Sequence, residues 1–166
     1  LYKSAEGMND IINMKVARDM KNLYFYADTA KDIKIGNNGT NMVLFISSGR
    51  TDSEKWAEQF DFAIVPTAQD SGTATLSSLH KSGSMTNVGS CRIKIVGNKI
   101  MVEVPLDLLG IPYSESNKTI GIQFKWADSF IKKDGALDVW SFYRDGDAAP
   151  MGRMTYVFSN KISEKQ

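Results

Sequence analysis

Apolar and polar side chains alternate along most of this chain with a period of two residues. In residues 23–27, Leu23 and Phe25 share one phase, while Tyr24 and Tyr26 fall on the opposite face. This period is typical of half-buried β-strands, because successive side chains point to opposite faces of a sheet. The segments that follow the pattern are residues 12–17, 23–27, 42–47, 60–65, 91–96, 99–104, 119–126, 138–143 and 153–158. Turns rich in Gly, Asn and Asp separate them, which favours an all-β sandwich or barrel.

One hairpin can be predicted residue by residue, because the two-residue loop Gly97-Asn98 favours a primed turn and thereby fixes the register. A shift by one residue would move every apolar side chain to the other face. The expected pairs are Val96 with Lys99, Ile95 with Ile100, Ile93 with Val102, Arg92 with Glu103 and Cys91 with Val104.

Three segments depart from the alternation. Residues 52–59 carry a short helical pattern, in which we expect Trp56 to be a partly packed loop residue. Residues 71–89 are rich in Ser, Thr and Gly and predict a long surface loop with one poor strand. In residues 105–111, Pro105 suits the start of a helical turn and Gly110 suits its end. We expect this turn to cross from one sheet to the other.

The composition is that of an ordinary globular protein, and we expect one domain that spans residues 1–166. Apolar residues make up 42% of the 166 residues, and 20 basic against 19 acidic residues leave a net charge of +1. This balance gives no basic surface for nucleic acid. No apolar run reaches the roughly 18 residues that a spanning helix needs. We therefore expect neither nucleic acid nor a membrane as a partner.

The residues of most catalytic sites are scarce, because His80 is the only histidine and Cys91 the only cysteine. A Ser-His-Asp triad, a Cys-His pair and a zinc site therefore lack members. Glycine motifs for phosphates or dinucleotides are absent, and no carboxylate pair suited to glycoside hydrolysis stands out. We expect no enzyme and no cofactor. Since the chain opens at Leu1, we also expect it to be a piece of a longer protein whose secretion signal lies elsewhere.

Aromatic and polar residues gather in segments 123–128 and 140–145. Aromatic rings stack on the apolar faces of sugars, and charged side chains bond the sugar hydroxyls. The pattern predicts a carbohydrate-binding site formed by Trp140, Tyr143, Arg144, Asp128 and Trp126. A position in the core is the alternative for both tryptophans, because Trp126 continues the apolar phase of Phe124 and Trp140 that of Phe142.

The glycine turn that contains Asp145 and Asp147 is the most distinctive segment. Two carboxylates at this spacing are candidate ligands of a structural calcium ion. The alternative is a turn in which Asp147 or Asp128 forms an ion pair with Arg153.

These segments, taken in order, resemble a known group. The matching stretches are residues 9–11, 15–19, 22–27, 42–46, 56–62, 124–128 and 146–150, with Arg153 and Tyr156. Residues 9–158 are similar to the C-terminal β-sandwich of large bacterial glycoside-hydrolase-like proteins, which is related to family-9 carbohydrate-binding modules and DOMON-type domains. The chain departs from the group where Asn41 replaces a Trp and Ser47-Ser48-Gly49 replaces an acidic pair.

The resemblance implies an antiparallel, jelly-roll-like β-sandwich without a catalytic role, in a bacterial protein that is secreted or held at the cell surface. Family-9 modules clamp a sugar between aromatic residues and often hold structural calcium. The first hypothesis is thus a glycan-binding accessory module, with other domains of the same polypeptide as further partners. The second is a structural module that docks on a neighbouring catalytic domain and binds no sugar. A DOMON-type heme site is a third hypothesis, for which His80 in a loop is a poor axial ligand.

Overall fold

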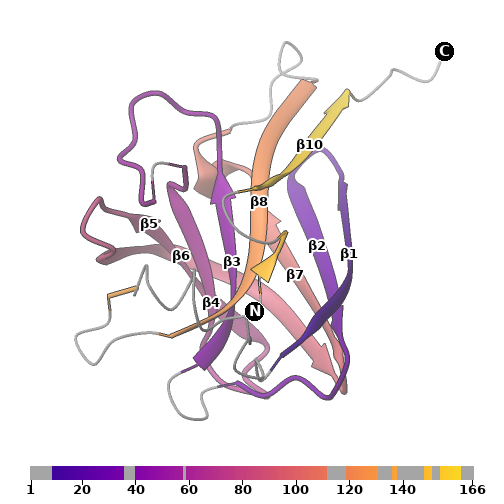
Figure 1. Ribbon diagram of the computed structural model, residues 1–166. Coiled ribbons are helices and arrows are strands. Elements are labelled where there is room, and N and C mark those ends of the chain that lie inside the picture. Colours follow the sequence, from indigo (N-terminus) through magenta and orange to yellow (C-terminus); the bar gives the residue numbers. More distant parts are fainter. Residues whose placement is uncertain are drawn as a thin grey trace, which may run out of the picture.

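The computed structural model describes residues 9–35, 40–57, 59–111, 119–130, 136–137, 148–150 and 154–161. Within them lie ten strands and one short 3-10 helix (Figure 1). No helix among these residues is long and apolar enough to cross a membrane. The elements are β1 (Ile11–Arg18), β2 (Asn22–Thr29), β3 (Thr40–Ser47), β4 (Phe62–Pro66), β5 (Thr73–Leu79), β6 (Met85–Val96), β7 (Lys99–Pro105), η2 (Asp107–Leu109), β8 (Thr119–Phe130), β9 (Ala148–Ala149) and β10 (Tyr156–Lys161).

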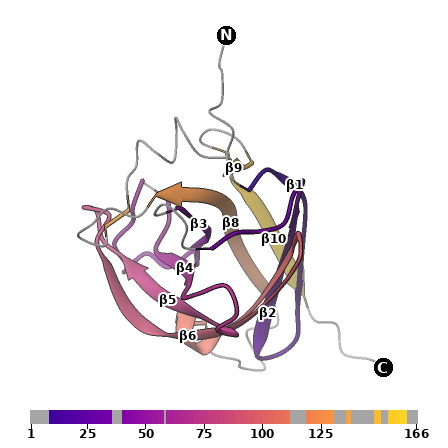
Figure 2. The same ribbon diagram turned by 90° about the horizontal axis from the view of Figure 1, so that it is seen from below.

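The ten strands form one antiparallel sheet in the order β1-β2-β7-β6-β5-β4-β3-β8-β10, with β9 paired to β8. The sheet curls round until its two ends, β1 and β10, face each other, and the result is a nearly closed, barrel-like ring (Figure 2). The structure thus confirms the all-β antiparallel fold, in the form of one curled sheet.

The inside of the ring is the main hydrophobic core. Alternate residues of each strand fill it, as the period of two predicts: Leu23 and Phe25 of β2 are completely buried, and Val102 of β7 is 1% exposed. Each fully buried side chain of this size contributes roughly 1.5–3 kcal/mol to folding. Phe25 meets Phe124 of β8 edge to face, with ring centroids 5.2 Å apart, so strands distant in sequence are joined through the interior.

A second, smaller cluster covers part of the outside of the sheet. Val43 and Phe45, which point outward from β3, are completely buried there. The covering residues come from the connection between β3 and β4, where Trp56 stacks on Phe45 with ring centroids 5.2 Å apart and Phe60 lies 5.3 Å from the same ring. Trp56 lies in a loop, as predicted, but at 3% exposed it is buried and not the partly packed residue that was expected.

The predicted hairpin is confirmed between β6 and β7. The observed pairs run from Val96 with Lys99 to Arg92 with Glu103 in the expected register, and the last pair forms an ion pair of 2.7 Å. The fifth predicted pair, Cys91 with Val104, lies beyond the last pair of this ladder. The turn after β7 is also confirmed as the 3-10 helix Asp107–Leu109, and Gly110 ends it in a left-handed conformation with φ of 69°.

The short helical pattern of residues 52–59 produces no helix among the described residues; residues 52–57 form bends, a bridge at Trp56 and a turn, in keeping with the loop predicted around Trp56. One prediction is wrong: residues 71–89 contain most of a hairpin, β5 with β6, where a long surface loop with one poor strand was expected. One reason is a β-bulge: Leu76 pairs with Gly89 and Ser77 with Asn87, so Val88 of β6 is an extra residue that breaks the period of two in that strand. The strand predicted at 138–143 lies outside the described residues.

Candidate carbohydrate-binding face

The outer face of β2 carries two neighbouring tyrosines. Because the core takes the alternate residues of β2, Tyr24 and Tyr26 point outward and are half-buried. Lys15 of β1 and Met101 of β7 lie opposite Tyr26, one on each side. A hollow of about 440 Å³ lies on this surface. Its outward-pointing lining residues, here named the tyrosine face, are Lys15, Ala17, Tyr24, Tyr26 and Met101.

A carboxylate holds each tyrosine hydroxyl. Tyr24 donates its hydroxyl hydrogen to Asp19 Oδ2 at 2.7 Å, and Tyr26 donates to Asp28 Oδ2 at 3.1 Å. A ring fixed at both its Cβ and its hydroxyl loses little side-chain freedom when a ligand stacks on it. This face is therefore better organised for binding than two free surface tyrosines would be.

These hydrogen bonds also shift the pKa values of Asp19 and of the two tyrosines. The bond from Tyr24 lowers the pKa of Asp19, and the backbone N–H groups of Lys21 and Asn22, each 2.7 Å from Asp19 Oδ1, lower it further. The same bond raises the pKa of Tyr24. Burial, and then the bond to its own carboxylate partner, raises the pKa of Tyr26. At neutral pH the face thus presents neutral phenols beside the ionised carboxylate of Asp19.

Charged and polarisable groups surround the two rings. The Lys15 ammonium lies 5.7 Å from the centroid of the Tyr26 ring, within the range of a cation–π contact. On the other side, Met101 is 50% exposed and offers a soft apolar surface. Glu103, the next outward residue of β7, is paired with Arg92 of β6. Apolar ring faces beside hydrogen-bonding groups are what recognition of a sugar requires.

Five of the sequence-predicted site residues lie outside the described part of the chain: Trp140, Tyr143, Arg144, Asp145 and Asp147. The described residues contain no group of three or more His, Cys, Asp or Glu side chains that could hold a metal ion.

The other two predicted residues, Trp126 and Asp128 of β8, point into the interior of the curled sheet. Trp126 is 1% exposed and belongs to the main core, which favours the core alternative over a sugar platform. Its indole N–H is buried without a hydrogen-bond partner. Asp128 is 2% exposed, and its Oδ2 accepts the backbone N–H of Asn9 at 3.2 Å. Neither residue offers an exposed surface to a glycan.

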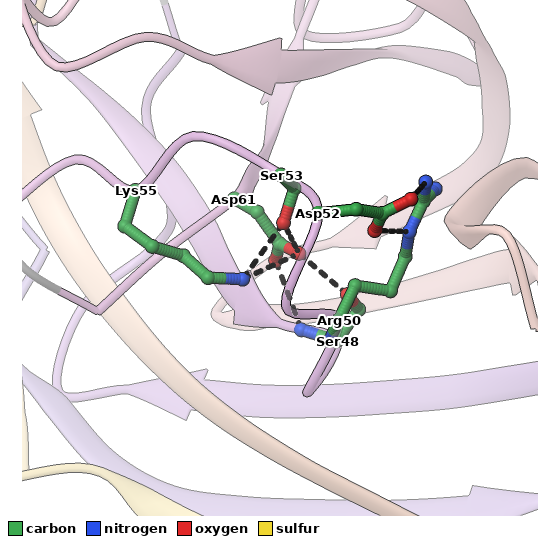
Figure 3. A network of polar contacts seen from close by, with 6 residues as sticks. All are labelled: Ser48, Arg50, Asp52, Ser53, Lys55 and Asp61. Carbon is green, nitrogen blue, oxygen red and sulfur yellow. Dashed lines mark hydrogen bonds and ion pairs between the residues drawn. The ribbon is translucent and has the colours of Figure 1, made fainter.

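A buried carboxylate organises the connection between β3 and β4 (Figure 3). Asp61 is 1% exposed and accepts four hydrogen bonds. The backbone N–H and the hydroxyl of Ser48 donate two of them, the former at 2.9 Å. The Ser53 hydroxyl donates at 2.9 Å and the Lys55 ammonium at 3.0 Å. These four residues are named the Asp61 cluster.

The hydrogen bonds of the Asp61 cluster stabilise the connection between β3 and β4 and do not activate a nucleophile. Lys55 Nζ also donates to the Ser53 hydroxyl at 2.8 Å, so it forms an ion pair with the carboxylate while donating to the serine. A lysine that activates a serine must accept a proton, and this arrangement does the opposite. By tying residues 48–55 to Asp61, the cluster holds Trp56 over the outer side of β3.

The tyrosine face was not selected by sequence reasoning, although the period of two had already placed Tyr24 and Tyr26 on one face. The missing information was the cross-strand neighbourhood, because Met101 lies 75 positions along the chain from Tyr26. Asp19 and Asp28, which flank the two tyrosines in sequence, were the available signal.

No family model, no curated protein and no solved structure matches this chain. The resemblance to carbohydrate-binding modules therefore stays a prediction, and function must be argued from the geometry of the surface.

Proposed function

We propose that this domain is a non-catalytic carbohydrate-binding accessory module of a larger secreted, glycan-active protein of bacterial type, and that the tyrosine face contacts the sugar. The observation that carries the proposal is the pair Tyr24 and Tyr26, outward on one strand, with each hydroxyl fixed by a carboxylate. The jelly-roll-like form of the sandwich is part of the same proposal.

The ligand is a soluble or surface-bound polysaccharide whose sugar rings lie flat on the two phenol rings. The free lone pairs of Asp19 accept hydrogen bonds from sugar hydroxyl groups, and Lys15 donates to those hydroxyls. Few polar contacts survive after desolvation, so the Kd falls on the order of 1 µM–1 mM, or about −4 to −8 kcal/mol. Trp140, Tyr143 and Arg144 stay candidates for a further glycan contact.

The test starts with a glycan array, which identifies the polysaccharide used as the probe. Tyr24→Ala and Tyr26→Ala should each weaken binding of that polysaccharide by about tenfold or more, because stacking area is lost. Tyr26→Phe keeps the ring and should retain most of the affinity. Tyr156→Ala, on β10, is the control for removal of an exposed tyrosine from another surface.

Urea melts of each variant separate lost binding from lost folding. The proposal is rejected if the array gives no signal, or if both alanine variants bind as tightly as the parent protein.

The alternative function is a structural module that docks on a neighbouring domain and binds no sugar. The observation that favours it is the exposure of apolar side chains on the two strands at the ends of the sheet. Ile12 of β1 is 62% exposed and Val157 of β10 is 71% exposed. Large exposed apolar side chains near one another mark protein interaction sites.

A further inference from the structure

The two ends of the sheet face each other across a groove. Among the described strands, β1 pairs only with β2 and β10 only with β8. A hollow of about 390 Å³ lies between them, and both strands contribute to its lining. We name it the seam; its lining residues include Ile12, Met14, Val16, Phe124, Tyr156 and Val157.

The seam opens onto the core. Tyr156 lies directly opposite Phe124 in the β10–β8 ladder, so both rings point to the inside of the sheet, with centroids 5.7 Å apart. Phe124 is 4% exposed, as a core residue should be, whereas Tyr156 is 43% exposed. Met14 and Val16 face the core from β1 and are only partly buried. Among the described residues, interior-facing side chains are thus only partly covered along the line between β1 and β10.

Strand directions determine what kind of strand would close the ring here. The nine strands from β1 to β10 are joined by eight antiparallel pairs, and each pair reverses the direction. After an even number of reversals, β1 and β10 run in the same direction. Direct pairing between them would be parallel, in a sheet that is otherwise wholly antiparallel. One additional strand, running opposite to both, would complete two antiparallel ladders and close the barrel.

We infer that the seam binds an extended peptide segment of another polypeptide, which inserts as a strand between β1 and β10. Backbone N–H and C=O groups on both edges pair with the peptide backbone, the interaction that joins an added strand to a sheet. Apolar side chains at alternate positions of the peptide cover Met14, Phe124 and Tyr156. The inference does not depend on sugar binding by the tyrosine face.

The geometry separates this occupant from others. A folded second copy could pair one of its edge strands with β1 or with β10, but that strand already has a neighbour on its other side and cannot pair with both. A small apolar molecule would make no use of the backbone groups along the two strands. Lys15 is the only charged residue in the described lining, so charge complementarity favours a peptide without basic residues and with an acidic one near Lys15.

The experiment selects from a library of random heptapeptides displayed on phage, with the whole chain as bait. Enriched peptides should alternate apolar and polar residues, lack proline and carry an acidic residue. A synthetic copy of the most enriched peptide should slow amide hydrogen exchange along β1 and β10 when it binds. Absence of enrichment, or protection confined to other strands, overturns the inference.

Variants locate the site. Val157→Lys and Tyr156→Ala should weaken binding of the synthetic peptide by about tenfold or more. Val96→Lys is the matched control, because Val96 is a 60% exposed apolar residue on β6, away from the seam, and its replacement should change nothing. Val157 is too exposed for its replacement to unfold the domain. Equal binding by all four proteins would refute the proposal.

Two readouts keep the alternatives apart. Sedimentation of the chain alone should show a monomer; a dimer with protected β1 and β10 amides would show that a second copy occupies the seam, and the inference would be wrong. Tyr26→Ala should leave peptide binding intact, and Tyr156→Ala should leave binding of the array-selected polysaccharide intact. Failure of the seam and failure of the tyrosine face are therefore distinguishable.

Discussion

Replacing Asp61 by Ala should be one of the most destabilising single changes outside the main core. Its carboxylate is 1% exposed and accepts hydrogen bonds from Ser48, Ser53 and Lys55. An alanine removes the acceptor and leaves the donors in place. The Lys55 side chain, 26% exposed, can turn toward water, but Ser48 is 7% exposed and its backbone cannot move without moving the end of β3.

The size of the effect follows from those groups. A buried donor that loses its acceptor costs roughly 1–3 kcal/mol, and Ser48 contributes two such donors. Removal of one partner from a buried ion pair costs about 3–5 kcal/mol as a whole. Because Lys55 recovers part of its solvation, we expect a loss of about 3–5 kcal/mol in the free energy of unfolding. The packing of Trp56 on Phe45 should loosen at the same time, since Asp61 positions that connection.

The measurement is urea unfolding followed by tryptophan fluorescence, which also reports on Trp56. Asp52→Ala is the matched control: its carboxylate is 67% exposed and forms a bidentate ion pair with Arg50, at 2.9 Å for both contacts. Exposed ion pairs contribute little, so the control should unfold close to the midpoint of the parent. Equal shifts for the two variants would show that the buried hydrogen bonds of Asp61 stabilise the fold no more than an exposed ion pair does.

Two further predictions concern the sheet. Burial lowers the pKa of Lys125 to about 8 from an ordinary 10.5, so the unfolded chain binds more protons between these values. Relative to Lys125→Met, the parent should therefore gain up to about 3 kcal/mol of stability from pH 8 to pH 10.5, and this gain should be lost as the pH falls back to 8. Burial also raises the pKa of Cys91 to about 12, which acts alike in both proteins. Thermal melts of the two proteins across this range should show the difference, and the same slope in both would contradict it. In the β6–β7 hairpin, Val102→Ala should lower the free energy of unfolding by about 1–4 kcal/mol, because a cavity remains in the core. Lys94→Ala, on the opposite face, should change the urea midpoint little. Similar losses for the two variants would contradict the register.

The apolar period and the turn residues were sufficient to predict a hairpin with a two-residue turn. The β6–β7 hairpin was predictable to the residue because Gly97-Asn98 leaves one register that buries Ile93 and Val102 together. The β5–β6 hairpin failed the same analysis. Its two buried leucines serve different clusters, because Leu76 faces the main core and Leu79 the outer cluster, and the ladder skips Val88 of β6, so the segment never shows a continuous apolar period of two.

The closure of the sheet could not be predicted from alternation and turn residues. Alternation in 42–47 and 119–126 predicts two strands, but nothing local says that β3 pairs with β8, some 80 positions further along, or that the order ends in β1 and β10. Long-range pairing decides whether strands make two layers or one curled sheet. It also creates the tyrosine face and the seam, since each combines residues from strands that are not consecutive in the chain.

Lys125 shows the limit of the alternation itself. Its phase, opposite to that of Phe124 and Trp126, correctly places it on the outer side of β8, where a lysine is expected to meet water. The side chain is nevertheless 1% exposed, beside Phe45 of β3, and Nζ donates to the carbonyl oxygen of Met154 at 3.2 Å. Parity determines which side of the sheet a residue occupies. Burial depends on whether another segment covers that side, and here the outer cluster and the approach to β10 do so.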